Sequence, residues 1–132
     1  MEISAEVTGP LADGTAERAL SNWSDAVAKR LGDEGVKLLG DFPMNKGGHS
    51  KVRGGFKKNL KVLQEGPVAR IPGPMIKGVT WAPWLEGTSK RNSSTRFAGY
   101  HLFRKTAQEL RKRAPEIGQQ ELDKIMPQLG GD

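Results

Sequence analysis

Residues 75–91 have the sequence MIKGVTWAPWLEGTSKR, and they join an apolar segment to a polar one. Residues 75–81 place Met75, Val79 and Trp81 on one face of an extended chain, which is the period-two pattern of a β-strand. Trp81 and Trp84 then enclose an alanine and a proline, and a segment rich in glycine, hydroxyl groups and charge follows. Large aromatic side chains are usually buried, whereas such polar segments lie in solvent. We therefore expect a strand end whose tryptophans anchor a polar loop.

Two further strand-like segments precede this junction, at residues 60–64 and 67–71. Turn signals separate the segments, because Gly66-Pro67 follows the first and Pro72-Gly73-Pro74 follows the second. Short connections of this kind predict a small antiparallel sheet. Lysines alternate with apolar residues along it, so we expect one face to be packed and the other to be wet.

Helical patterns lie on both sides of the predicted sheet. Residues 15–40 carry an apolar residue every three or four positions, at Ala16, Leu20, Trp23, Val27 and Leu31. A second stripe of this spacing comprises Phe97, Tyr100, Phe103, Ala107 and Leu110, with Ser93, Ser94 and Thr95 as candidate caps. Pro115 suits the first turn of a further short helix. The sequence thus predicts an α+β fold with a long N-terminal helix, a small antiparallel sheet and one or two C-terminal helices packed on the sheet.

A chain of 132 residues is expected to form a single domain, residues 1–132. Glycine, proline and polar residues predict a flexible N-terminal tail over residues 1–13 and a flexible C-terminus over residues 127–132. They also predict a mobile, basic, glycine-rich loop over residues 43–55.

The net charge of +6 is distributed unevenly along the chain. Residues 1–40 carry four basic and seven acidic side chains, and residues 41–113 carry sixteen basic and four acidic ones. Residues 114–132 return to one basic and four acidic side chains. A basic middle between acidic ends is compatible with nucleic-acid binding, with a ring in which the acidic end of one copy meets the basic middle of the next, or with a solvated surface.

Few residues suggest chemistry. The chain has no cysteine, which excludes disulfides and thiolate metal sites, and neither His49 nor His101 has a second ligand at metal-binding spacing. The segment GGHSKVRGG lacks the order of a phosphate-binding loop, and no serine lies in a Gly-x-Ser-x-Gly elbow. Because Glu86 is the only acid between Glu65 and Glu109, no local carboxylate pair is indicated. We expect no catalytic residue, no cofactor and no metal.

No apolar run approaches the ~20 residues that span a bilayer, and the N-terminal residues lack a hydrophobic signal segment. We therefore expect no membrane contact and an origin inside a cell.

The junction resembles a segment of the small head–tail joining proteins of long-tailed double-stranded DNA phages, also described as tail-completion, tail-terminator or minor-tail-Z-like proteins. Their pattern is Tyr-Ala-x-Tyr/Trp-hydrophobic-Glu-x-Gly-Thr, and WAPWLEGT at residues 81–88 is similar to it. Trp81 replaces the first tyrosine, and the residue between glutamate and glycine is absent. A weaker resemblance places Gly54, Phe56, Asn59 and Leu60 on an upstream strand motif of the family, with Arg53 where threonine is usual.

This resemblance implies a virion protein of the neck or tail, assembled in the host cytoplasm. Its subunits would form a homo-oligomeric ring, often a hexamer, that contacts the head connector or stopper and the tail tube while DNA passes through the centre. We expect Trp81, Trp84 and Leu85 to be packing anchors of the interface, and Glu86 to form a polar lock with Arg91 or Arg96. Nonspecific contact with DNA in the channel is expected from the basic loop, at Lys46, Lys51, Arg53, Lys57 and Lys58.

The alternative function is a nucleic-acid-binding domain that uses the basic region 46–113. In that case the aromatic residues of the junction and the following helix would supply stacking surfaces.

Overall fold

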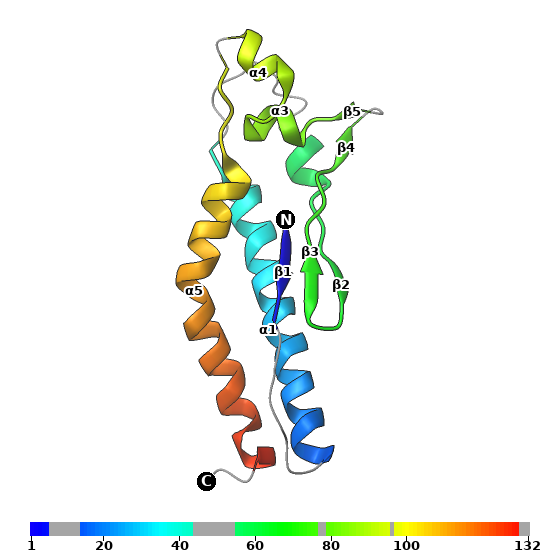
Figure 1. Cartoon of the computed structure of the whole chain (residues 1–132), viewed down its shortest axis with the longest axis vertical. Coiled ribbons are helices and arrows are strands. Elements are labelled where there is room, and N and C mark those ends of the chain that lie inside the picture. Colours follow the sequence, from blue (N-terminus) through cyan, green and yellow to red (C-terminus); the bar gives the residue numbers. More distant parts are fainter. Residues whose placement is uncertain (6–13, 44–54, 77–78, 96, 130–132) are drawn as a thin grey trace.

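The computed structural model describes residues 1–5, 14–43, 55–76, 79–95 and 97–129. Its framework is a pair of long helices, α1 (Gly14–Asp41) and α5 (Leu102–Ile125), which run side by side in opposite directions (Figure 1). We call the end formed by the C-terminus of α1 and the N-terminus of α5 the upper end, and the opposite end the lower end. The predicted helix over residues 15–40 is confirmed within two residues at each end. The α+β fold class is confirmed as well.

A three-stranded antiparallel sheet lies beside α1 (Figure 1). It comprises β1 (Glu2–Ser4), β2 (Leu63–Glu65) and β3 (Val68–Arg70) in the order β1-β3-β2. Ala69 is the central register point, since it pairs with both Ile3 and Gln64. The strand predicted at residues 67–71 is confirmed, whereas the one predicted at 60–64 lies at 63–65 instead.

Strand β1 corrects the prediction of a flexible tail over residues 1–13. Residues 2–4 pair with β3, and the backbone amide of Ile71 donates to the carbonyl of Met1 at 2.9 Å. The N-terminal ammonium in turn donates to the carbonyl of Ile71 at 3.2 Å. A strand of three residues is too short to show alternation in the sequence, and its pairing partner is about seventy residues away. Residues 6–13 lie outside the described part.

The strand predicted over residues 75–81 is wrong. The chain forms a tight hairpin of β4 (Met75–Ile76) and β5 (Val79–Thr80), in which Met75 pairs with Thr80 and Ile76 with Val79. A period of two continues through a short reversal as well as through one straight strand, so the pattern alone did not distinguish them. The two residues between the arms, 77–78, lie outside the described part.

Two short helices replace the predicted strand end and loop. They are α3 (Ala82–Glu86), which has a proline in its first turn, and α4 (Lys90–Ser94). The predicted caps at residues 93–95 therefore belong to α4, and α5 begins only at Leu102. Helix α5 also continues through Pro115 instead of ending there, and a 3₁₀ helix, η1 (Met126–Leu129), follows within the segment predicted to be flexible.

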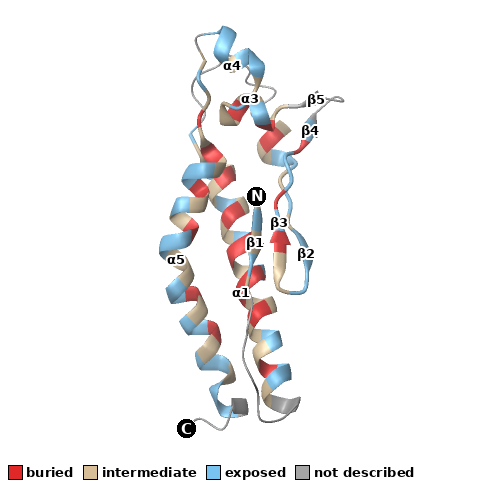
Figure 2. Ribbon diagram, viewed as in Figure 1, coloured by how far each residue is buried: buried red, intermediate tan, exposed pale blue. Residues whose placement is uncertain are grey.

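The core lies where α1, α5 and the sheet meet (Figure 2). Its lower part consists of Val27, Leu31, Leu110 and Ile117, and its upper part contains the fully buried Leu39, Phe56, Ile71 and Leu102. The indole Nε1 of Trp23 donates to the carbonyl of Gly118 at 2.9 Å and so fastens the two helices near the lower end.

Glycines on α1 allow the sheet to approach closely. A Cβ on Gly32 would lie 2.9 Å from a methyl group of Val62 and 3.2 Å from Ala69, and one on Gly35 would lie 2.8 Å from Ile71. Both contacts are tighter than ordinary van der Waals contact, so a side chain at either position would make the methyl groups of Val62 or Ile71 shift.

Candidate interaction surfaces

The aromatic side chains of the junction pack together at the upper end. The rings of Trp84 and Phe97 are 4.7 Å apart, those of Phe97 and Tyr100 are 5.0 Å apart, and Tyr100 meets Phe42 edge-on at 6.2 Å. Leu85 is buried in the same cluster. Trp81 and Trp84 are half-buried and pack against it. The predicted anchors thus all contact the core. Trp81 lies directly after the end of β5, as expected of a strand end, whereas Trp84 and Leu85 belong to α3.

Asn92 ties the segment that follows, residues 87–95, to this aromatic cluster. Its amide nitrogen donates to the carbonyls of Trp84 at 3.0 Å and Phe97 at 2.9 Å. Its side-chain oxygen accepts from the amide of Ser89 at 2.9 Å, and the Ser89 hydroxyl caps the start of α4. Sequence reasoning missed Asn92, but the spacing Ser-x-x-Asn is a variant of the capping box and was the available signal.

Two glycines allow the chain to return across its own backbone. Gly87 and Gly99 have φ values of 107° and 94°, in the region that side chains disfavour. A Cβ on Gly99 would collide with the backbone of Gly87. This close crossing brings the amide of Tyr100 to 2.6 Å from the carbonyl of Leu85, and that of His101 to 3.1 Å from the carbonyl of Glu86. The two ends of the segment between Gly87 and Gly99 are therefore held together by backbone contacts.

Glu86 holds the N-terminus of α5. Its carboxylate accepts from the backbone amides of Phe103 at 2.7 Å and Arg104 at 3.3 Å. The residue before the helix, His101, provides no side-chain cap and has a φ of 54°. A carboxylate at this position satisfies free amides and interacts favourably with the helix dipole.

The predicted polar lock of Glu86 with Arg91 is wrong, and the alternative lock with Arg96 stays a prediction. Glu86 binds the backbone of α5 instead of Arg91, whose side chain is exposed. The alternative partner, Arg96, lies outside the described residues. The sequence could not indicate the true partners, because backbone amides leave no signature in the sequence.

The predicted DNA-channel residues are placed only in part, since Lys46, Lys51 and Arg53 lie outside the described residues. Lys57 and Lys58 belong to a helical turn at residues 55–58, in which Lys57 is half-buried and Lys58 is exposed. The turn is anchored by Phe56, whose buried ring meets that of Phe103 edge-on at 6.1 Å.

Charge is polarised along the helix pair. The first half of α5, residues 102–114, carries five cations and one carboxylate, for a net charge of +4. The second half, residues 115–125, carries three carboxylates and one lysine, for a net charge of −2. The upper end, where α5 begins, is therefore basic along this helix, and the lower end is acidic (Figure 1).

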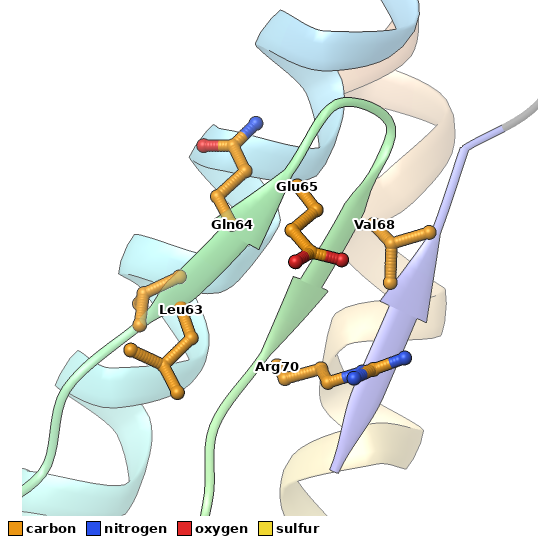
Figure 3. A pocket seen from close by; sticks show the side chains of 6 residues that line it. Leu63, Gln64, Glu65, Val68 and Arg70 are labelled. Carbon is orange, nitrogen blue, oxygen red and sulfur yellow. The ribbon is translucent and has the colours of Figure 1, made fainter.

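The sheet leaves its outward face and one edge open. All three residues of the edge strand β2 are exposed, and Leu63 is 50% exposed. A hollow of about 400 Å³ lies on this hairpin, lined by Val62, Leu63, Gln64, Glu65, Val68 and Arg70 (Figure 3). Across the sheet Arg70 pairs with Glu2 at 2.8 Å, so the outward face combines an exposed leucine with charged groups.

Within the described ranges, no group of three or more acidic, histidine or cysteine side chains is placed to hold a metal ion. None of the helices in those ranges is both long and apolar enough to cross a membrane.

Comparisons with family models, with curated proteins and with solved structures found no match for this chain.

Proposed function

We propose that this chain is a structural virion protein of a tailed phage. In this proposal it forms a homo-oligomeric ring at the head–tail interface, where it acts as a tail terminator or tail-completion protein. The ring, often of six copies in the family that the junction resembles, joins the head connector to the tail tube and lets DNA pass.

The observation that carries the proposal is the way residues 87–95 are held. Asn92 fixes them to the backbone of Trp84 and Phe97, and the glycine crossing closes their base. Yet the side chains that they present are exposed polar groups, namely Thr88, Lys90, Arg91, Ser93, Ser94 and Thr95. A surface loop needs no such fixation for solubility, whereas a preformed polar surface reduces the entropy lost when another subunit binds.

Two further features support self-assembly. The opposite charges of the two halves of α5 favour heterologous contacts, in which unlike surfaces of neighbouring copies meet, and such contacts form a ring when the rotation between copies closes. The exposed strand β2 has an unpaired edge that another chain can extend, and natural monomers usually protect edges of this kind.

The test is the mass of the purified chain as a function of its concentration, measured by light scattering. Wild type is expected to self-associate into a closed oligomer, and the double variant Lys90→Glu/Arg91→Glu is expected to remain near the 14.4 kDa of one chain. The matched control is Arg18→Glu/Lys37→Glu, which makes the same charge change on the exposed face of α1 and should still assemble. A wild type that stays monomeric at every concentration, or equal effects of the two variants, would refute the proposal.

The second candidate is a nucleic-acid-binding domain that uses the basic region 46–113. The net charge of +4 on the first half of α5 favours it. Sequence-specific binding of DNA by the monomer at physiological salt would replace the first proposal by this one.

A further inference from the structure

The first half of α5 carries four exposed cations on one helical face. Arg104, Lys105, Arg111 and Lys112 are all exposed, and Gln108 lies between the two pairs and is exposed too. Spacings of three, four and seven residues keep these positions on one side of a helix. The opposite side of this half carries the buried Leu102, Thr106 and Leu110. At 1.5 Å per residue the stripe, defined as these five positions, is about 12 Å long.

Three of the four cations in the stripe have no carboxylate partner among the described residues. Arg104, Lys105 and Arg111 form no ion pair with any residue that the structure describes, and the ammonium of Lys105 lies 5.8 Å from the ring of Phe42. Lys112 approaches Glu109 only at 4.0 Å, with its own side chain 77% exposed.

Four of the six other cations on α1 and α5 are paired with a carboxylate, one of them Lys124 with Glu121. Arg113 contacts both Glu34 and Glu109, Arg30 contacts Glu121 and Lys29 contacts Asp33. The other two, Arg18 and Lys37, form no ion pair with a described residue either, but neither has a second cation within four residues along α1. The stripe differs because four cations gather on one helical face, where their fields add and attract an anionic partner.

The composition of the stripe selects the class of partner. Protein interfaces depend on buried aromatic or aliphatic anchors, and helices that lie on membranes insert apolar side chains. The stripe contains neither, because its five side chains are basic or amide groups. Arginine binds phosphate with paired hydrogen bonds, and a line of fixed cations matches a line of phosphates. Gln108 adds hydrogen-bonding capacity without adding charge.

We propose that the face of α5 formed by Arg104, Lys105, Gln108, Arg111 and Lys112 binds the phosphate backbone of duplex DNA without reading its sequence. This surface is distinct from the predicted channel loop. The inference does not depend on the ring, and it narrows the second candidate function to five residues and to binding that is independent of DNA sequence. The ring proposal and the DNA-binding proposal can be refuted separately, because assembly is measured as a molecular mass and DNA contact as salt-dependent binding.

The experiment is a titration of the full chain into a fluorescent DNA duplex of about 24 base pairs, followed by anisotropy at roughly 50 to 200 mM salt. Each phosphate contact contributes about −0.9 to the slope of log affinity against log salt, so four contacts predict a slope of about −3.6. Over this fourfold range of salt, the affinity should fall about 150-fold. Two duplexes of unrelated sequence should behave alike.

The diagnostic variant is Arg104→Gln/Arg111→Gln, which removes two contacts and should reduce the slope to about −1.8, a fall of about 12-fold over the same range. The matched control is Arg18→Gln/Lys37→Gln, with the same loss of charge on α1 and an expected slope of about −3.6. Circular dichroism checks that each variant is folded, and Lys105→Gln/Lys112→Gln gives a second reading of the same surface.

Equal slopes for the stripe variants and the α1 control would overturn the inference, because net charge alone would then explain the binding. Binding to phosphatidylserine vesicles at least as tight as to DNA would also overturn it, since the stripe would then be a membrane surface.

Discussion

Replacing Glu86 with glutamine tests whether a side chain on α3 holds the start of α5. The carboxylate accepts from two backbone amides, those of Phe103 and Arg104. Glutamine keeps one acceptor oxygen but presents an NH₂ group to the second amide, and it removes the charge that interacts with the helix dipole. One charge-assisted hydrogen bond and part of the dipole term are lost, about 1–2 kcal/mol of the free energy of unfolding. Alanine removes both bonds and should cost about 2–3 kcal/mol.

These energies convert to measurable shifts in Tm. An unfolding entropy of about 2.1 cal/mol/K per residue gives about 0.28 kcal/mol/K for this chain, or roughly 4 °C per kcal/mol. We therefore expect Tm to fall by about 4–7 °C for Glu86→Gln and by about 7–11 °C for Glu86→Ala. Thermal unfolding followed by circular dichroism at the helix band measures both shifts.

The matched control is Glu116→Gln, which neutralises an exposed carboxylate in the middle of α5. Among the described residues its carboxylate accepts one hydrogen bond, from the side chain of Gln120 at 3.3 Å, so the expected change is below about 0.5 kcal/mol, or about 2 °C. If Glu86→Gln lowers Tm no more than Glu116→Gln does, the carboxylate does not cap α5, and the account of the junction fails.

Two other substitutions test how the segment over residues 87–95 is fixed. Asn92→Ala leaves two carbonyls and one amide without their partner and should lower Tm by roughly 7–11 °C. The control Ser93→Ala removes an exposed hydroxyl and should change Tm by less than about 2 °C. Equal shifts in Tm for the two variants would contradict the role of Asn92. Gly87→Ala should cost at least about 2 kcal/mol in urea unfolding, because φ is 107° and the new Cβ meets the carbonyl of Ala98. Gly40→Ala, at a helical position with open space around it, should instead raise the free energy of unfolding by about 0.5–1 kcal/mol. If Gly87→Ala also stabilised the protein, the close approach of the chain at Gly87 would be refuted.

The helices were predictable where a long apolar period exists. The spacing of Trp23, Val27 and Leu31 predicted α1, because every such residue faces α5 or the sheet. The period of α5 is also visible, but its start was predicted too early. Phe97 and Tyr100 continue the helical spacing, yet they pack as aromatic residues of an extended connection. Apolar spacing records burial, and a non-helical segment that crosses the core can produce the same spacing.

The sheet was less predictable because its stability comes from distant partners. Strand β1 has three residues, and its hydrogen bonds go to β3 about seventy residues later. The hairpin of β4 and β5 carries the same alternation as a single strand. In both cases the sequence contains the residues but not the pairing.

The candidate site was only partly predictable, because some of its contacts are made by backbone groups. Trp84 and Leu85 were expected to be anchors because large apolar residues beside a polar segment must be covered, and both pack on the upper core. The partners of Glu86 and Asn92 are backbone groups, which every residue supplies, so no side-chain pattern identifies them. Because Arg91 is close to Glu86 in sequence, we expected the two to form an ion pair. The carboxylate of Glu86 instead binds the N-terminus of α5, which is more distant in the sequence.

Electron cryo-microscopy of the neck of tailed-phage particles assembled with this chain tests the proposed function most directly. The account predicts a closed ring between the head connector and the tail tube, into which copies of the α1–α5 pair fit, with residues 87–95 at the contact between neighbours. A neck and tail whose density is filled entirely by other chains would contradict it.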